Sequence, residues 1–236
     1  MIKLENFEVV GWEHAIRGMR NPMNSWEKSD SVFVDDGEYH DIMGNSGPTK
    51  VCVTDSETYF EIGPNDHDLM MRLAAGGPVH AKYRRMITVY VDITAPLYWW
   101  KEFDTYKVGT VANSCSTMHK IHAKSFTVDD FSCSILGYGT VPELKQHYKH
   151  FTLIIDSLNN LRDLYLKTND KTYWDAMIQM LPSSYNQKRT VMLNYEVLHN
   201  IYTSRKNHKL YEWHAVCDWI ETLPYSEIIT GGKDAV

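Results

Sequence analysis

The sequence has no apolar run that approaches the ~20 residues needed to cross a bilayer, which excludes a membrane-spanning helix. Its start, MIKLENFEVVGW, lacks the basic region and apolar segment of a signal peptide, so we expect a cytoplasmic protein. Neither an internal repeat nor a low-complexity tract is present. The 236 residues therefore predict a single domain, residues 1–236, with a tail from about residue 223.

Cysteines are also few, and acidic residues outnumber basic ones. The four cysteines, at positions 52, 115, 133 and 217, form no CxxC pair and no zinc-like spacing. This pattern predicts free thiols rather than a disulfide framework or a metal site. The formal net charge of −6 argues against a general nucleic-acid-binding protein, although it is compatible with a local basic pocket for a phosphate.

Hydrophobic periodicity predicts few strands and several long helices, in a mixed order typical of an α+β fold. We expect strands at residues 4–10, 50–54 and 86–94. The expected helices cover residues 12–19, 65–75 with Asn65 or Asp66 as the cap, 80–85, a segment from Pro96, 142–167, 171–180, 187–204 and 209–222. The apolar stripe of the 142–167 helix predicts that one of its faces lies in the core.

The stretch from Pro96 to Lys120 is the first candidate site. It begins as an aromatic amphipathic helix, and after Gly109 it becomes a run of small hydroxyl, amide and thiol residues. Such a run on a loop or helix start can form the wall of a ligand site, because backbone N–H groups can approach an anion or a heterocycle closely there. The alternative is an ordinary N-cap and polar turn, since turns use the same residue types.

The stretch NYEVLHNIYTSR, residues 194–205, is the second candidate site. On a helix, Asn194 and Arg205 would project from nearly the same side, with Leu198 and Ile201 between them. A planar ligand could lie on this apolar middle while Arg205 pairs with a phosphate or carboxylate. The alternative is that Arg205 and His208 only satisfy the helix C-terminus and that Asn194 is an ordinary surface residue.

The segment from Leu181 to Trp213 resembles the C-terminal signature of the flavin-dependent thymidylate synthases. In that family two asparagines and an arginine contact flavin and the deoxyuridylate substrate, and Asn194, Asn200 and Arg205 have the same spacing. GGPVHAKYRRMITVYVDITAP resembles the family's helix–strand–helix segment, and WEHAIRGMR is similar to its first Ala/Arg-rich helix. The resemblance covers about residues 8–222 and implies an α+β fold with a small mixed or antiparallel sheet flanked by long helices.

The family's hallmark motif, RHRxxSxNExSxR, is where this sequence departs from the family. Aligned without gaps, the RHR triplet falls on Thr105, Tyr106 and Lys107, and with a shift of one residue it falls on Tyr106, Lys107 and Val108. Both outer arginines and the final arginine are absent in either alignment, while Lys107 keeps one positive charge.

Two further basic residues, Arg84 and Arg85, stand near the place of the family's Glu-His pair, so the charge there is reversed. If Arg84, Arg85 and Lys107 replace the cations of the motif, the pocket binds phosphate and flavin and the enzyme is active. If they do not, the fold remains while the reaction or the ligand differs, because function belongs to sites and not to folds.

The resemblance implies an enzyme that methylates the uracil of dUMP at C5, with FAD as cofactor and with NADPH and methylene-tetrahydrofolate as co-substrates. It also implies a homotetramer whose sites are built between chains. The implied substrate-binding residues are Arg205, Ser116, Cys115, Asn113 and Glu102. The implied cofactor-binding residues are Asn194, Asn200, Lys107, Thr110, Arg85 and Arg84.

The reaction that the resemblance implies needs no nucleophilic cysteine, so we interpret Cys115 as a thiol that packs in the structure or lines the ligand site. One alternative is a catalytically silent or altered-specificity nucleotide- or flavin-binding paralogue on the same fold. Another is a different uridylate-modifying flavoenzyme on that scaffold.

Overall fold

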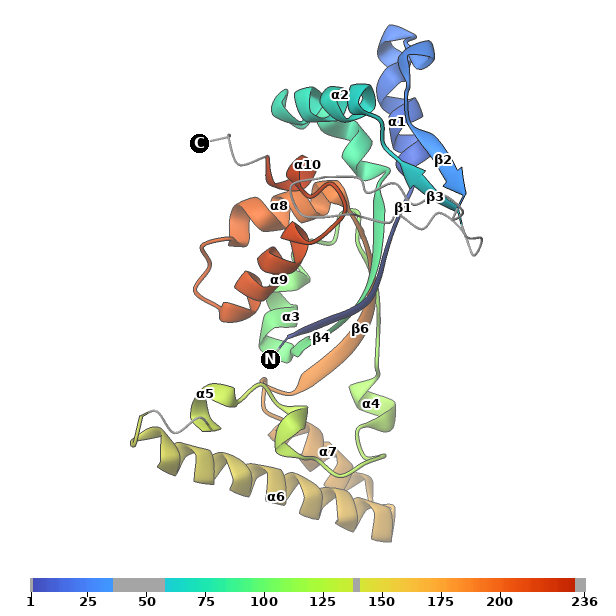
Figure 1. The fold of residues 1–236 in the computed structure, drawn as a ribbon. Helices are drawn as coiled ribbons and strands as arrows, with labels where there is room; N and C mark the ends of the chain where they lie inside the picture. The colour runs from blue at the N-terminus through green and yellow to red at the C-terminus, as the bar shows by residue number, and fades with distance from the viewer. Residues whose placement is uncertain (1, 36–57, 138–140, 232–236) are drawn as a thin grey trace. The chain divides into compact units, whose positions relative to one another are not determined.

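The computed structural model describes residues 2–35, 58–137 and 141–231, and this part of the chain is α+β, as the sequence predicts (Figure 1). The strands are β1 (Lys3–Val10), β2 (Val32–Asp35), β3 (Thr58–Glu61), β4 (Thr88–Pro96), β5 (Val111–Ser114) and β6 (Asn186–Asn194). The α-helices are α1 (Trp12–Arg20), α2 (Pro64–Ala75), α3 (Leu97–Phe103), α4 (Thr117–Lys120), α5 (Ser134–Gly137), α6 (Leu144–Thr168), α7 (Lys171–Met180), α8 (Tyr195–Arg205), α9 (Tyr211–Glu221) and α10 (Glu227–Thr230). Short 3₁₀ helices are η1 (Asn21–Met23), η2 (Trp26–Lys28), η3 (Ala81–Arg85) and η4 (Val128–Asp130).

The larger sheet has four strands in the order β1-β4-β6-β5, so β5 is an edge strand. Strand β4 forms where predicted, because buried Val89, Val91 and Ile93 alternate with more exposed residues along it. Strands β2 and β3 pair antiparallel in a separate sheet, where Phe33 lies opposite Phe60.

Contacts divide the chain into two compact units. The first comprises Met1–Lys3, Ile93–Thr105 and Asn113–Arg189, and the second comprises Leu4–Asp92, Tyr106–Ala112 and Thr190–Val236.

The core of the first unit forms where α6 and α7 lie side by side (Figure 1). Leu158 of α6 and Met177 of α7 are fully buried in it, which confirms that the apolar stripe of α6 faces a core. The segment before α5 is held to α6 by Asn159, whose side chain accepts from the N–H of Phe126 at 2.8 Å and donates to its carbonyl at 2.9 Å. This pairing fixes Phe126 and its neighbours over the apolar face of α6.

In the second unit, aromatic side chains of α1 and α8 form the centre of the core. Trp12 and Tyr195 are buried and meet edge to face, with ring centroids 5.3 Å apart. The hydroxyl of Tyr195 donates to the carbonyl of Pro224, so the polar end of this buried ring has a partner. Ile228 and Ile229 of α10 are also fully buried, although they lie in the stretch predicted as a tail.

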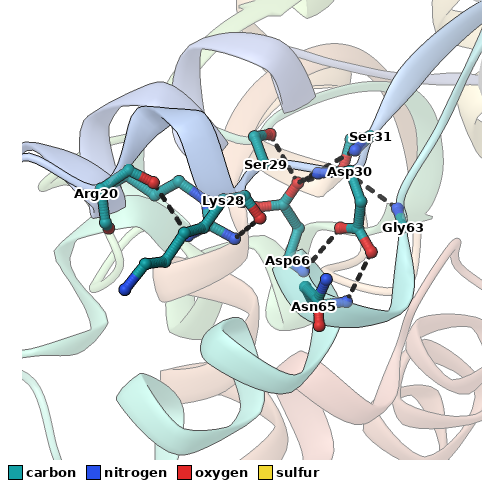
Figure 2. Close-up of polar contacts among 9 residues, drawn as sticks. Arg20, Lys28, Ser29, Asp30, Ser31, Gly63, Asn65 and Asp66 are labelled. Atoms are coloured by element: carbon teal, nitrogen blue, oxygen red, sulfur yellow. Dashed lines mark hydrogen bonds and ion pairs between the residues drawn. The ribbon is translucent and has the colours of Figure 1, made fainter.

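A buried ion pair in the second unit joins α1 to the start of α2 (Figure 2). Nε of Arg20 donates to Oδ1 of Asp66 at 2.6 Å, and both side chains are almost fully buried. The other carboxylate oxygen of Asp66 accepts from the hydroxyls of Ser29 and Ser31 at 2.7 and 2.6 Å. Burial by itself raises the pKa of Asp66, but these hydrogen bonds and the charge of Arg20 hold it below its usual value.

The cap of α2 differs from the prediction, because neither Asn65 nor Asp66 caps the helix through its own side chain. The N-cap residue is Gly63, and Asp30 accepts from the backbone N–H groups of Asn65 and Asp66 at 2.9 and 3.1 Å (Figure 2). A carboxylate distant in sequence therefore satisfies the first turn of α2 and leaves Asp66 for the ion pair.

Two other predictions need correction. The expected helix 187–204 is the strand β6 followed by α8, because Thr190, Val191 and the residues around them lie between β4 and β5 in the sheet. Part of the run after Gly109, expected on a loop or a helix start, forms the edge strand β5, whereas the end of the run lies at the start of α4, where Ser116 accepts from the N–H of His119. The strand expected at 50–54 lies outside the described residues.

None of the helices that the structure describes is both long enough and apolar enough to span a membrane.

Candidate functional site

Helix α8 begins at Tyr195, and Asn194, the last residue of β6, is its N-cap. Its Oδ1 accepts from the backbone N–H of Val197 at 3.0 Å, while its own backbone is extended. The N–H of Tyr195 donates to the carbonyl of Ile87 at 3.0 Å, which fixes the start of α8 against the residue before β4. Within the described residues the amide nitrogen of Asn194 has no hydrogen-bond partner, so it can donate to a ligand.

The turn at Gly109 packs directly against this helix start. Gly109 has φ +80°, and a Cβ built on it would lie 2.9 Å from Nδ2 of Asn194 and 3.3 Å from Cγ2 of Val197. The next residue, Thr110, has a buried Oγ1 with no partner among the described residues. The absence of a side chain at Gly109 thus lets this turn pack closely against the N-terminus of α8.

Arg205 lies at the other end of α8, where aromatic side chains hold its guanidinium. Nε of Arg205 donates to the hydroxyl of Tyr106 at 3.0 Å. The guanidinium carbon lies 4.9 Å from the ring centroid of Trp213, a cation–π distance, and 5.7 Å from that of Tyr106. Tyr106, which stands within the altered arginine triplet, therefore fixes the orientation of the arginine expected to bind the nucleotide.

The residues expected between Asn194 and Arg205 as a wall for a planar ligand are core residues. Leu198 and Ile201 are each only 1% exposed. The expectation fails because Asn194 is an extended N-cap residue rather than part of the helical face, and because the apolar side of α8 packs into the second unit.

Arg84 is buried beside the first turn of α8. Its Nη1 lies 3.7 Å from Oε2 of Glu196, and both side chains are less than a tenth exposed. Nε of Arg84 and Oε2 of Glu196 have no hydrogen-bond partner in the described part of the chain. Burial raises the pKa of the neighbouring Tyr83, although the charge of Arg84 opposes this effect. Arg84 thus pairs with Glu196, whereas Arg85 is exposed.

Of the remaining expected cofactor residues, Lys107 and Asn200 are both exposed in the second unit. Lys107 belongs to the same turn as Gly109 and Thr110, and its carbonyl accepts from the N–H of Thr110 at 3.4 Å. Asn200 lies on an outward side of α8. The turn that contains Lys107 and Thr110 therefore packs against Asn194 through Gly109, whereas Asn200 lies on the exposed surface of α8.

The other four expected residues, Glu102, Asn113, Cys115 and Ser116, belong to the first unit. The N–H of Cys115 donates to the carbonyl of Lys188 at 2.9 Å, and its carbonyl accepts from the side chain of Gln187. The hydroxyl of Ser116 accepts from the N–H of His119 at 3.0 Å. The backbone of Cys115 is thus occupied by its neighbour strand, contrary to the expectation of backbone N–H groups open to an anion.

Reasoning from the sequence missed Glu196 and Trp213 as parts of this constellation. Glu196 is an acidic residue in the first turn of a helix, which is ordinarily explained by the helix dipole. Trp213 follows the spacing of an amphipathic helix, and this pattern predicts a core residue. Among the described residues, no group of three His, Cys, Asp or Glu side chains could hold a metal ion.

No protein-family model and no curated protein matches the chain. The fold, however, matches solved structures over nearly its whole length. A structure of thymidylate synthase X from Helicobacter pylori with FAD and dUMP has a TM-score of 0.58 and 18% identity, covering 94% of this chain and 96% of that one. A UMP/dUMP methylase, PolB from Streptomyces cacaoi, bound with 5-Br UMP, has a TM-score of 0.57 and 11% identity, covering 98% and 93%.

Proposed function

This chain has the fold of the flavin-dependent thymidylate synthases, and on that premise we propose that it methylates dUMP to dTMP with bound FAD. Methylene-tetrahydrofolate would supply the carbon and NADPH the reducing equivalents. The observation that carries the proposal is the geometry of α8, which has Asn194 at its start and Arg205 at its end. A residue of the segment 106–110 lies against each of them.

The donors at the start of α8 fit a flavin nucleotide. The unpartnered hydroxyl of Thr110 and the amide nitrogen of Asn194 are hydrogen-bonding groups of the kind that ring carbonyls and ring nitrogens require. The exposed cations Lys107 and Arg85 suit the two negative charges of a pyrophosphate. We therefore assign Lys107, Thr110, Asn194 and Arg85 to hold the cofactor, with Asn200 as a further contact from the surface of α8.

Arg84 would act by supporting this arrangement from the interior. Its charge faces Glu196 in the first turn of α8, so it balances a carboxylate that has little access to water. Loss of Arg84 would leave that carboxylate unpaired and disturb the turn that Asn194 caps.

Arg205 would bind the phosphate of dUMP. The hydroxyl of Tyr106 and the ring of Trp213 restrict the guanidinium before the nucleotide arrives, so less conformational entropy is lost on binding. Glu102, Asn113, Cys115 and Ser116 would complete the nucleotide site, in a homotetramer whose chains share their sites.

Bound flavin would supply the hydride chemistry, as a cofactor does in enzymes of this kind. The protein's own contribution would be to orient the nucleotide through Arg205, to hold the cofactor through Asn194 and Thr110, and to compensate charge through Lys107.

A nucleotide-binding paralogue without this activity is the second candidate, and the absence of both outer arginines of the motif in either alignment favours it. Flavin uptake separates the two. The proposal predicts that purified protein incubated with FAD and desalted keeps a flavin absorption spectrum, and that Asn194→Ala reduces the bound fraction. Colourless protein from the wild type, with native circular dichroism, would decide for the second candidate.

A further inference from the structure

The second unit contains a cavity of about 390 Å³ that the proposed function does not use. Its lining comes from helix α1, from the stretch between Trp26 and Ser31, and from the paired strands β2 and β3. The volume lies at the lower end of the roughly 300–1,000 Å³ typical of small-molecule sites. The cavity therefore suits a small ligand with one ring system.

Aromatic side chains provide the apolar part of the lining. Phe33 of β2 lies opposite Phe60 of β3, and the two rings meet edge to face with their centroids 5.0 Å apart. Phe60 is almost fully buried, whereas Phe33 and Trp26 are each 50% exposed. A single exposed aromatic side chain is common, but Trp26 and Phe33 line the same cavity. Together they offer apolar surface that the ring of a ligand can cover.

The buried Arg20 fixes the segment that carries Trp26 (Figure 2). Nη1 and Nη2 of Arg20 donate to the carbonyls of Ser25 and Lys28 at 3.2 and 3.0 Å, on either side of Trp26 in the chain. Nε1 of the indole donates to Oδ1 of Asn21 at 2.8 Å. Because both the backbone and the ring of Trp26 are held in the free protein, less conformational entropy is lost when a ligand binds.

The other polar groups of the lining that come from the interior are already hydrogen-bonded within the protein. The hydroxyls of Ser29 and Ser31 donate to the carboxylate of Asp66 at 2.7 and 2.6 Å, and Nε of Arg20 donates to the same carboxylate. The charge of Arg20 is therefore balanced by Asp66. Recognition of charged groups on a ligand falls to the exposed side chains of α1.

Helix α1 brings one charge of each sign to the cavity. Glu13 and Arg17 lie about one turn apart on the helix, and both line the cavity together with Ile16. Neither charged side chain has a hydrogen-bond or ion-pair partner among residues 2–35, 58–137 and 141–231. Glu13 would repel a ligand that is only an anion, and Arg17 would repel one that is only a cation. The pair therefore favours a ligand that carries both an ammonium group and a carboxylate.

We propose that this cavity binds a small aromatic zwitterion, with the chemistry of a free aromatic α-amino acid. The ring lies against Trp26, Phe33 and Phe60, the ammonium group pairs with Glu13, and the carboxylate pairs with Arg17. No residue of the cavity belongs to the flavin or nucleotide site of the proposed function, so this binding stands or falls independently of that activity.

Equilibrium dialysis with four matched compounds tests the class of ligand. L-Phenylalanine carries the ring and both charges, phenylpropionate lacks the ammonium group, phenethylamine lacks the carboxylate, and L-alanine lacks the ring. We expect L-phenylalanine to bind roughly tenfold or more tightly than each of the other three, because each of them loses one charged pair or the apolar contact. No measurable binding of L-phenylalanine overturns the inference, as does equally tight binding of any of the other three.

Two variants on α1 test the charged residues. Arg17→Gln should abolish the preference for L-phenylalanine over phenethylamine, because the carboxylate loses its partner. Glu13→Gln should abolish the preference over phenylpropionate, because the ammonium group loses its partner. Both side chains are exposed, so the variants should fold, and circular dichroism checks this. Preferences that both variants retain at the wild-type level overturn the inference.

A third variant tests the place of the ring. Phe33→Ser removes a half-exposed ring and should weaken the binding of L-phenylalanine several-fold. The matched control for the charge variants is Arg72→Gln, since Arg72 is exposed and forms an ion pair with Asp68 on α2, and it should leave all four affinities unchanged. Wild-type affinity for L-phenylalanine in Phe33→Ser would place the binding outside this cavity and overturn the inference.

Discussion

The hydroxyl of Tyr106 accepts a hydrogen bond from Nε of Arg205 at 3.0 Å, and this contact joins the altered motif to the helix that carries the expected nucleotide-binding arginine. The family's triplet has arginines where this chain has Tyr106 and its neighbours. In the proposed function, this contact orients Arg205 for the nucleotide although the outer arginines of the triplet are absent.

Arg205→Ala should weaken dUMP binding by at least ~1.5 kcal/mol, the lower range for a hydrogen bond to a charged group. Tyr106→Phe should have a smaller effect in the same direction, because it keeps the ring and removes only the acceptor for Nε. Titration calorimetry measures both. The control is Arg72→Ala, since Arg72 is exposed and forms an ion pair with Asp68 on the same helix. Equal dUMP affinity of Arg205→Ala and the wild type would show that Arg205 does not bind the nucleotide.

Gly109→Ala should destabilise the fold more than Gly77→Ala does. Both glycines have positive φ, near +80° and +87°, so alanine is strained at either position. Only at Gly109 would the new Cβ meet a neighbour, Nδ2 of Asn194 at 2.9 Å, whereas nothing lies within 4 Å at Gly77. We expect the free energy of unfolding in urea to fall further at Gly109 by about 1 kcal/mol or more. Equal losses in the free energy of unfolding for the two variants would show that the turn accommodates the added Cβ without displacing Asn194.

Asn194→Ser and Asn194→Ala separate capping from ligand binding. Serine can still cap α8, so Asn194→Ser should keep nearly the wild-type free energy of unfolding, whereas Asn194→Ala should lose roughly 1 kcal/mol. Both variants lack the amide nitrogen and should bind FAD more weakly than the wild type. If Asn194→Ser instead bound FAD as tightly as the wild type and only Asn194→Ala bound it more weakly, capping would be the only role of Asn194.

Asp66→Asn should lower the free energy of unfolding by about 3–5 kcal/mol, because it leaves the buried Arg20 without its counter-charge. The control is Asp68→Asn on the same helix, whose partner Arg72 is 68% exposed, with an expected loss of about 0.5 kcal/mol or less. Similar losses in the two variants would contradict the role of the ion pair shown in Figure 2.

The same carboxylate gives a pH dependence. The pKa of Asp66 is lower in the folded state than its usual 3.8, so its contribution to stability is complete above that value and is lost as the pH falls through the folded pKa. Acid should therefore destabilise the wild type more steeply below pH 3.8 than it destabilises Asp66→Asn. Parallel stability curves for the two proteins in this range would show that another group dominates.

The sequence predicts those parts of the fold whose signals are local. Trp12 and Ile16 follow the helical period of α1, and Val89 and Val91 follow the strand period of β4, so these elements form where periodicity places them. Strand β6 was missed because Gln187 and Lys188 at its start carry no strand signal, and its hydrogen bonds come from distant strands.

Most residues of the candidate site could be named from the sequence, but the contacts between them could not. The spacing of Asn194 and Arg205 is readable from the sequence, but their partners are not. Tyr106 and Glu196 acquire their roles from contacts between segments distant in the chain, with Arg205 and Arg84 respectively. Likewise, the close approach of Gly109 to Asn194 exists only once the turn is folded against α8.

Tritium release from [5-³H]dUMP tests the central claim most directly. The protein is incubated with FAD, NADPH and methylene-tetrahydrofolate, because substitution at C5 of uracil must expel the label from that carbon. We expect release and dTMP formation by the wild type, with an Arg72→Ala protein like it and an Arg205→Ala protein at least tenfold slower. A folded wild-type protein that binds FAD yet releases no tritium would contradict the assignment of this chain as a thymidylate-forming enzyme.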